Sequence, residues 1–411
     1  MAVTAGIEIR SPSADEIERF ASTVMTGFAE ASHPEDVKRW QQELRPDRQY
    51  WAFDGDVPVG SAGTYDHRLS IPGGEVQIAA VTLVTVHPSH RRRGILRQLM
   101  RRQLDHAHEL GEPVAALWAS EGPIYPRFGY GVATTAVSIA AERDRMEFRP
   151  PDEPAGRVRL VSDEEAYALF PPIYKEVQTR TPGMLARHES WWKGYRLADP
   201  EHWRSGAGPM FRAVWEDDGG EPQGYALYRV RENWEGFVAA SGLESREVFA
   251  TTPQAWREIW RFVFGVDLIR TVKTWNLPPD HPLFLSVTEP RRLHATAGDG
   301  LFVRLLDLGA ALEARSYAAD GALTFEVRDP FCSWNEGVWT LSAERGSGSV
   351  EQGGEPELRL DVADLGSTYL GGWSFAALAR AGRVEELHEG AIERADELFR
   401  TPAQPWCPEV F

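Results

Sequence analysis

A strand, a basic loop and a helix follow one another without interruption between residues 82 and 107. Thr82–Val86 is short and rich in β-branched residues, which predicts a strand. The strand must end in His87–His90, because Pro88 fixes φ and donates no N–H group. Beyond this loop, apolar residues recur at the spacing of an amphipathic helix, at Ile95, Leu96, Leu99, Met100, Leu104 and Ala107.

The junction between loop and helix has the geometry of an anion-binding site. The first N–H groups of a helix have no partner inside it and lie at the positive end of its dipole. Gly94 has no side chain to keep a ligand away, and Arg91–Arg93 add positive charge. A phosphate or pyrophosphate is the expected ligand, although the chain has neither G-x-x-x-x-G-K-[ST] nor a G-x-G-x-x-G after a strand. The alternative, a solvated basic loop, is less favoured because the arginines lie between a strand and a helix.

Composition limits the classes of protein and of partner. At about 100–200 residues per domain, 411 residues predict two to four domains. The hydrophobic content of 42% is enough to form their cores, and 15 Trp indicate several packed modules or an aromatic-lined pocket. With 61 acidic and 44 basic residues the net charge is −17. This charge argues against nucleic acid as the main partner and favours a cationic small molecule or a basic, Lys-containing peptide.

The cysteines and the apolar runs predict a cytoplasmic protein without a metal site. Cys332 and Cys407 are the only cysteines, too few for a disulfide framework or a structural zinc site. His106 and His108 lie two apart on a helix and do not face each other, so no metal is expected. We also expect no signal peptide at the N-terminus and no membrane span, since no uncharged apolar run is long enough.

The first 150 residues predict two helices, an antiparallel meander, the long helix and one more strand. A strand at 7–10 precedes a helix that opens at Ser13–Glu16, and a second helical piece ends near Trp40. Strands follow at 49–53, 57–65, 76–86 and 113–119. Gly111 is the predicted C-cap of the long helix. Pro150–Gly156 has the composition of a linker.

The next part of the chain repeats this order without the basic loop. A strand at 158–161 precedes a helix that starts at Ser162, and strands at 211–215 and 224–228 flank an Asp-Gly turn. At the place of the arginine loop, residues 250–259 contain neither the arginine run nor the glycine. We therefore expect a second domain of the same fold without a cofactor site; an unrelated α+β domain is the alternative.

From about Pro290 the pattern predicts an antiparallel sheet followed by helices. Strands are expected at 302–307, 323–327, 337–342 and 358–362. Residues 346–349 and 353–356 are expected to be turns, and the last helix is expected over about 384–399. The chain ends in a Pro-rich, aromatic tail from Thr401 to Phe411.

The arginine loop resembles the acetyl-CoA signature of the GNAT superfamily of N-acetyltransferases. Their pattern is Gln/Arg-x-x-Gly-x-Gly/Ala, and here Arg91–Leu96 is Arg-Arg-Arg-Gly-Ile-Leu. The last position departs from the pattern, with Leu96 in place of a small residue. The order of elements in residues 1–150 is also the layout of these acetyltransferases.

A set of further motifs resembles one family more closely, the enhanced intracellular survival (Eis) family of actinobacterial acetyltransferases. The motifs are distributed over the whole chain, at residues 90–94, 119–122, 124–131, 224–230, 311–315 and 365–371. The resemblance implies an α+β protein with two tandem GNAT-like domains, the second degenerate, followed by a sterol-carrier-protein-like α+β domain. It implies a catalytic domain at 1–150, a degenerate domain at 151–288, and a third domain at 289–411 whose tail reaches the active site.

The same resemblance implies acetyl-CoA as co-substrate, amines of cationic substrates as acceptors, multi-site acetylation of aminoglycosides and a homohexamer. The pantetheine arm would lie along the backbone of Val84, Thr85 and Val86, as an added strand does at an open sheet edge. The pyrophosphate would be held by the loop and the first helical turn, at Arg92, Arg93, Gly94, Ile95, Leu96 and Arg97. Ser120 and Glu121, which directly follow the strand predicted at 113–119, match cofactor positions of the family.

Acetyl transfer to an amine needs an acid for the leaving thiolate and a base for the ammonium. A tyrosine suits the acid, and the family pattern puts it at Tyr125; Tyr130 is the rival, and either can be a packing residue. In the family the base is the C-terminal carboxylate, which here belongs to Phe411, although chain ends are often frayed. Residues that match the family's substrate pocket are Phe28, Glu30, Trp40 and Leu83, with Glu409 as an additional anion.

Two other functions remain open from the sequence. The chain can be a non-catalytic protein that binds lipids or small molecules and carries a vestigial acetyltransferase domain. It can also transfer another acyl group, as N-myristoyltransferases do with a duplicated fold and a C-terminal carboxylate. The complete Arg91–Gly94 loop and Tyr125 favour catalysis, because a vestigial copy should look like residues 250–259.

Overall fold

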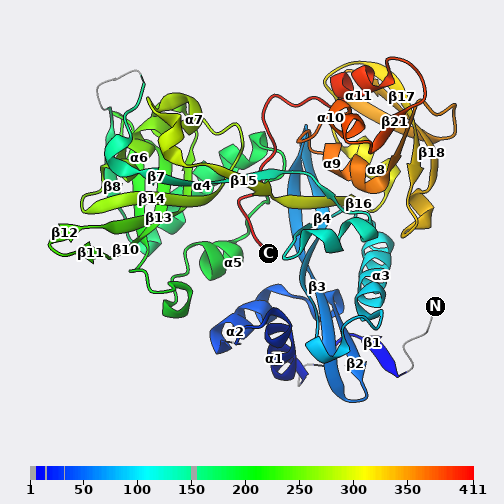
Figure 1. Cartoon of the computed structure of the whole chain (residues 1–411), viewed down its shortest axis with the longest axis horizontal. Helices are drawn as coiled ribbons and strands as arrows, with labels where there is room; N and C mark the ends of the chain where they lie inside the picture. The colour runs from blue at the N-terminus through cyan, green and yellow to red at the C-terminus, as the bar shows by residue number, and fades with distance from the viewer. Residues whose placement is uncertain (1–5, 14–15, 32, 150–154) are drawn as a thin grey trace. The chain divides into compact units, whose positions relative to one another are not determined.

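The computed structural model describes residues 6–13, 16–31, 33–149 and 155–411. Residue contacts divide the chain into two compact units, and Figure 1 labels most of their helices and strands. Unit 1 comprises Met1–Thr134, Gly300–Pro402 and Glu409–Phe411, and unit 2 comprises Thr135–Asp299 and Ala403–Pro408.

Two expected features fall partly outside the described residues. These are the helix start at Ser13–Glu16, which includes residues 14–15, and the linker at Pro150–Gly156, which includes residues 150–154. Among the residues that the structure does describe, no helix combines the length and apolar character needed to cross a lipid bilayer.

The first sheet belongs to unit 1 and has the strand order β1-β2-β3-β4-β5-β16-β6. Its strands are β1 (Ile7–Arg10), β2 (Gln49–Asp54), β3 (Val57–Ile71), β4 (Gly74–Val86), β5 (Val114–Trp118), β16 (Leu301–Leu305) and β6 (Gly131–Val132). All neighbours are antiparallel except β4 and β5. A parallel pair needs a crossover, and helix α3 (Ile95–Glu109) supplies it, as the helical spacing predicted.

The two faces of the first sheet carry different helices. On one face α3 packs on β4 in a core cluster that includes Ala79, Val81, Met100 and Leu104. On the other face α1 (Ile17–Phe28) packs on β2 through Val24, Trp51 and Phe53. Helix α2 (Pro34–Glu43) follows α1 and carries Trp40. The side-chain alternation of the strands therefore separates an α3 face from an α1 face.

The second sheet belongs to unit 2 and has the order β8-β9-β10-β13-β14-β7-β15. Its strands are β8 (Arg157–Leu160), β9 (Phe211–Glu216), β10 (Pro222–Arg231), β13 (Ser241–Ala250), β14 (Ile269–Leu277), β7 (Thr135–Glu142) and β15 (Thr296–Asp299). β13 and β14 are parallel and are joined by α6 (Pro253–Gly265). This order repeats the first sheet strand for strand, which confirms the second domain of the same fold.

The remaining elements of unit 2 follow from local signals. Helix α4 (Asp163–Arg180) starts with a capping box, in which Ser162 and Glu165 each accept a hydrogen bond from the other's backbone N–H. The other short elements are α5 (Glu189–Trp191), a π-helical turn at Trp192–Arg196, α7 (Leu283–Ser286), and the hairpin of β11 (Trp234–Glu235) and β12 (Val238–Ala239).

The two sheets exchange their sixth strands. β7 lies before residue 150 in the sequence but pairs with β14 in unit 2, and β16 lies after residue 288 but pairs with β5 in unit 1. The strand predicted at 302–307 therefore does not belong to the C-terminal antiparallel sheet. All five residues of β16 are buried, as an interior strand between β5 and β6 requires. The domain boundaries at 150 and 288 remain a proposal.

A third sheet lies in the C-terminal part of unit 1, with the order β19-β18-β17-β20-β21. Its strands are β19 (Ser347–Gln352), β18 (Gly337–Glu344), β17 (Gly321–Arg328), β20 (Leu358–Asp361) and β21 (Val384–Glu386). Four helices accompany it, namely α8 (Leu308–Ala314), α9 (Val362–Thr368), α10 (Phe375–Arg380) and α11 (Ala391–Phe399). Phe325, Phe375 and Phe399 pack their rings together in its core.

Two local predictions in this part were wrong. Residues 347–349 belong to β19 rather than to a turn, because the turn is confined to Arg345 and Gly346, both at positive φ. The last helix starts at Ala391 and not at Val384, because Gly390 at φ +81 caps it and Val384–Glu386 pairs with β20.

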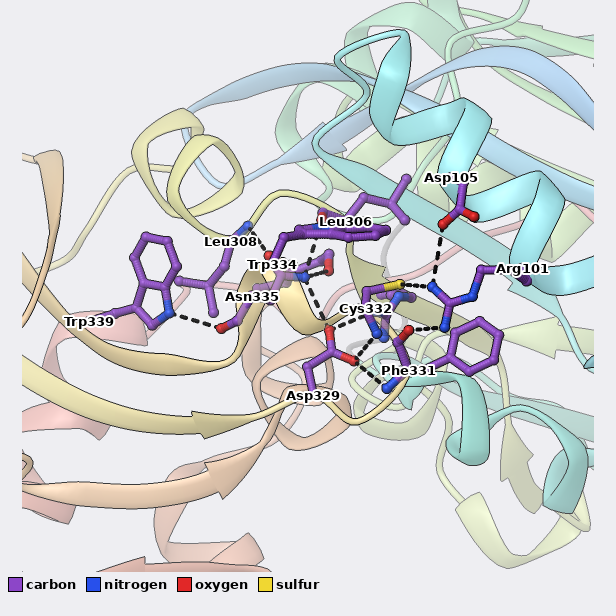
Figure 2. A network of polar contacts seen from close by, with 12 residues as sticks. Arg101, Asp105, Leu306, Leu308, Asp329, Phe331, Cys332, Trp334, Asn335 and Trp339 are labelled. Carbon is purple, nitrogen blue, oxygen red and sulfur yellow. Dashed lines mark hydrogen bonds and ion pairs between the residues drawn. The ribbon is translucent and has the colours of Figure 1, made fainter. Parts of the chain in front are cut away.

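A buried polar network joins the C-terminal part of unit 1 to the first sheet and α3 (Figure 2). Asp329 is fully buried; its Oδ2 pairs with Arg304 of β16 at 2.6 Å and accepts a hydrogen bond from Asn335 at 3.1 Å. Arg101 of α3 donates to the carbonyl of Phe331 and stacks over its ring. Because removing one partner of a buried ion pair is costly, this network fixes α3 and its first turn against the rest of unit 1.

Candidate active site

The predicted strand, loop and helix are present in unit 1. β4 ends at Val86, a 3-10 turn covers Pro88–His90, and α3 begins at Ile95. Gly94 lies at φ +80, and its carbonyl accepts the first helical hydrogen bond, from Gln98 N–H at 3.2 Å. No described atom lies within 4 Å of the position that a Cβ on Gly94 would take. The space beside Gly94, where α3 begins, is therefore open.

The three arginines of the loop have different surroundings. Arg91 donates to the carbonyls of Gly27 at 3.2 Å and Val86 at 3.4 Å, which joins the loop to the end of α1. Arg93 lies 3.6 Å from the carboxylate of Asp54. Arg92 is exposed and takes φ +64, which is uncommon for a residue with a side chain. The loop thus keeps at least part of its positive charge for an anionic ligand.

A β-bulge breaks β4 just before this loop. The pairing with β3 shifts between Ser61 and Gly63, and the bulged Leu83 takes φ +51. The Ser61 hydroxyl donates to the Leu83 carbonyl at 2.6 Å and holds the bulge. On its other side β4 pairs with β5 only at Ile78–Ala80, so in the described structure the segment Val84–Val86 has an edge that β5 does not cover. This edge suits an extended ligand that pairs like a strand.

Tyr125 follows β5 in a loop that also carries the exposed Ser120 and Glu121. Its ring packs against Tyr130 and Phe302, with centroids 6.0 and 6.4 Å away, and its side chain keeps 5% exposure. Burial, with a smaller contribution from the negative charge of Glu121, raises the pKa of the Tyr125 hydroxyl to about 12. Tyr125 therefore stays protonated over the whole neutral range.

Tyr130 is less suited to the chemistry than Tyr125. Its side chain is fully enclosed, and its hydroxyl has no hydrogen-bond partner among the described residues. Burial raises the pKa of this hydroxyl even further than that of Tyr125. A hydroxyl that is sealed in the core cannot contact a ligand, so Tyr130 is a packing residue.

The C-terminal Phe411 lies in unit 1 against β3. Its half-buried ring is 6.3 Å from the buried ring of His67. His67 pairs with Ile78 of β4, and the neighbouring residue Ala79 faces α3. Because consecutive strand residues point to opposite faces, Phe411 lies on the face that is opposite to α3.

The residues expected around a substrate come from three elements of unit 1. Phe28, at the end of α1, is 37% exposed, and Glu30 just beyond it is exposed. Trp40 on α2 and Leu83 in the β4 bulge are half-buried, and Leu83 packs against the Val24–Trp51–Phe53 cluster. Glu409 differs from them, because its side chain is fully enclosed.

Sequence reasoning missed the role of Asp54. It lies between the strands predicted at 49–53 and 57–65, and its carboxylate contacts both His90, at 3.1 Å, and Arg93. The partners are 36 and 39 positions away, and the sequence carries no local signal for such a pairing. Asp54 orients the loop and offsets part of its charge.

Three stretches of the chain match models of known domains. Residues 8–133 and 183–305 each match an acetyltransferase (GNAT) domain. Residues 308–408 match a sterol carrier protein domain. The three matches follow the order of the three sheets.

Full-length relatives are also similar to this chain. An uncharacterized N-acetyltransferase of Streptomyces avermitilis is 40% identical over 388 residues, covering 94% of each chain. The N-acetyltransferase Eis of Mycobacterium tuberculosis is 32% identical over 408 residues, covering 96% of each chain. The crystal structure of Eis1 from Mycobacterium abscessus matches with a TM-score of 0.84 at 32% identity, covering 98% of this chain and 100% of that chain. The likeness thus extends over the whole length of the chain.

Proposed function

The chain belongs to the Eis family of N-acetyltransferases, and on this premise we propose that it transfers the acetyl group of acetyl-CoA to amines of a cationic small molecule. The observation that carries the proposal is the open edge of Val84–Val86, which leads directly into the basic first turn of α3. The degenerate copy in unit 2 lacks these arginines, so acetyl-CoA has one expected site.

GNAT acetyltransferases use acetyl-CoA, and the residues present in unit 1 fit it. Pantetheine amides would pair with the backbone of Val84–Val86, and the N–H groups of Ile95, Leu96 and Arg97 would bind the pyrophosphate. Arg92 and Arg93 add positive charge there, and Ser120 and Glu121 would flank the other side of the cofactor. No metal is required for this chemistry.

In the proposed reaction the amine nitrogen attacks the thioester carbonyl, the new C–N bond forms, and the C–S bond breaks. The carboxylate of Phe411 takes the proton that the ammonium must lose. Tyr125 donates to the sulfur as negative charge develops there. Because a phenol of pKa about 12 is a weaker acid than a thiol of about 8.5, its main contribution is the hydrogen bond to the leaving sulfur.

The acid and the base approach from opposite faces of the first sheet. Tyr125 packs in the α3 cluster, together with Ala79 and Val81, whereas Phe411 lies with His67 on the other face. The place where both can act on one bond is the end of the β4–β5 pairing, beyond Ala80. This arrangement supports a reaction in which the thioester enters from the α3 face and the amine from the α1 face.

The substrate class follows from charge and from the aromatic surroundings. Phe28, Trp40 and Leu83 offer apolar walls, and Glu30 offers an anion, which together suit a polyamine cation such as an aminoglycoside. A net charge of −17 favours the approach of such cations. Multi-site acetylation and a homohexamer are part of the proposal on the basis of family membership. Neither of the two buried cysteines, Cys332 and Cys407, forms a disulfide, which supports a reducing, cytoplasmic setting.

The two ends of α3 offer a matched test of the cofactor site. Gly94→Ala is expected to weaken acetyl-CoA binding about tenfold, because Gly94 takes φ +80 and alanine would shift the first turn. Gly111→Ala is the control, since Gly111 takes φ +74 and also has no described neighbour within 4 Å of a Cβ. Both variants should lose similar thermal stability. Calorimetric titration with acetyl-CoA checks the result, and equal affinities of the two variants would contradict the assignment.

Thiol release from acetyl-CoA tests the function. Purified protein is offered aminoglycosides, linear polyamines and Lys-containing peptides, and the expected result is release with the aminoglycosides and polyamines. The same assay is repeated with longer acyl-CoA donors, because a preference for them would indicate transfer of a different acyl group. A protein that releases no thiol with any amine, but binds lipids, would support the non-catalytic alternative.

A further inference from the structure

The second sheet contains a strand gap at the same place as the proposed acetyl-CoA site of the first. β13 and β14 pair in parallel only between Ser241–Glu244 and Ile269–Lys273. Just beyond, the pairing of β13 with β10 shifts between Leu227 and Tyr228, which makes Arg246 the bulged residue. β4 has its bulge three residues after its last pairing with β5. Unit 2 therefore repeats both the bulge and the diverging strands.

The gap in unit 2 is filled by the tail of the chain. The residues that line it come from β13, from β14, from the tail and, with Trp260, from α6; they include Ser245, Glu247, Thr274, Asn276, Trp406 and Pro408. The cavity that remains is about 20 Å³, which is room for about one water molecule. A pantetheine arm therefore has no space here, even apart from the missing arginines.

Asn276 of β14 uses both ends of its amide to hold the tail. Its Nδ2 donates to the carbonyl of Cys407 at 2.7 Å, and its Oδ1 accepts from the indole N–H of Trp406 at 2.9 Å. Asn276 is 8% exposed, so these bonds form away from bulk water. The indole also packs against Phe249, with ring centroids 5.4 Å apart.

Further contacts hold the tail backbone. The N–H of Trp406 donates to the carbonyl of Pro182 at 2.9 Å, and Arg196 donates to the carbonyl of Pro408 at 3.2 Å. Gly183, at φ +95, lets the tail approach, since a Cβ there would lie 2.9 Å from the Trp406 carbonyl oxygen. All of these contacts lie within unit 2.

We propose that the strand gap of the second domain is a binding site for the chain's own tail, and that Asn276 is a positioning residue for the carboxylate of Phe411. Phe411 is three residues beyond Pro408, so a fixed tail confines it to within roughly 10 Å of this anchor. A base whose chain is already ordered loses little entropy in each turnover. The catalytic part of this inference rests on the proposed role of Phe411 as the base.

The anchor is tested in the full chain through the thiol of Cys407. Cys407 and Cys332 are both fully buried, so each is alkylated slowly. Asn276→Ala should make iodoacetamide react about tenfold faster with Cys407 and leave Cys332 unchanged, as peptide mass spectrometry can resolve. Lys273→Ala is the control, an exposed position on the same strand. An unchanged rate at Cys407, or an equal increase at both thiols, overturns the anchor.

The positioning role is tested by turnover. Asn276→Ala should lower kcat about tenfold, with acetyl-CoA affinity and the number of acetyl-CoA sites per chain both unchanged, whereas mere loss of folded protein would reduce the number of sites. Combined with a glycine added after Phe411, it should lower kcat no further than the added glycine does alone. Faster alkylation of Cys407 with full kcat would overturn the positioning role. If the added glycine leaves kcat unchanged, Phe411 is not the base. The binding of the tail by Asn276 is tested separately, by the alkylation rate of Cys407.

Discussion

Adding one glycine after Phe411 is expected to lower the turnover of amine acetylation about a hundredfold or more, while acetyl-CoA affinity stays within about twofold. One residue moves the terminal carboxylate by about 3.8 Å, beyond hydrogen-bond reach of a substrate nitrogen. A general base contributes roughly 10²–10⁴-fold to such reactions. The added residue leaves the tail contacts of Trp406 and Pro408 in place, so the loss should appear in kcat.

The structure supplies the control for this experiment. Val410 is 50% exposed, so Val410→Ala keeps both the chain length and the carboxylate and should retain full turnover. Single-turnover rates with saturating acetyl-CoA separate the chemical step from product release. If the extended chain keeps its rate, the base is not Phe411, and solvent or another carboxylate takes the proton.

The features predicted well from the sequence are those with local causes. Pro88 and Gly94 mark the ends of the loop by their backbone geometry, and the helical spacing after Gly94 does not depend on distant contacts. The capping box of Ser162 and Glu165 marked the start of α4 in the same way. The duplication was visible because each copy repeats its turns, and the loss of the arginines identified the degenerate copy.

The features that sequence reasoning missed depend on distant partners. Periodicity predicts that Leu301–Leu305 is a strand but not which sheet it joins. Its place between β5 and β6 is fixed by complete burial and by the pairing of Arg304 with Asp329, 25 residues later. Likewise, nothing near Asn276 indicates that its amide will hold a tail more than a hundred residues away.

The choice between Tyr125 and Tyr130 as the acid also required the three-dimensional structure. The two residues are five apart, in one loop rich in glycine and proline, and both are aromatic residues with a donor. Only burial separates them, because Tyr130 is enclosed on all sides and Tyr125 is not. The turnover rates of Tyr125→Phe and Tyr130→Phe test whether this difference in burial separates the acid from the packing residue.

Tyr125→Phe is expected to lower turnover on the order of a hundredfold, with unchanged acetyl-CoA affinity. Phenylalanine keeps the packing against Phe302 and removes only the hydroxyl that we propose as the donor to the sulfur. Because the pKa of Tyr125 is about 12, its proton is present at every pH below about 11, so the wild-type rate should show no alkaline loss from this group. The ratio of the two rates should therefore stay constant from pH 6 to about pH 10.

Tyr130→Phe is the matched control for Tyr125→Phe. It removes a hydroxyl that is buried without a partner among the described residues, so turnover should be unchanged and thermal stability equal or slightly higher. Rates measured across pH for both variants decide the assignment. If Tyr130→Phe lowers turnover as much as Tyr125→Phe does, the choice of Tyr125 is wrong. If both variants keep full turnover, neither tyrosine is the acid, and solvent protonates the leaving sulfur.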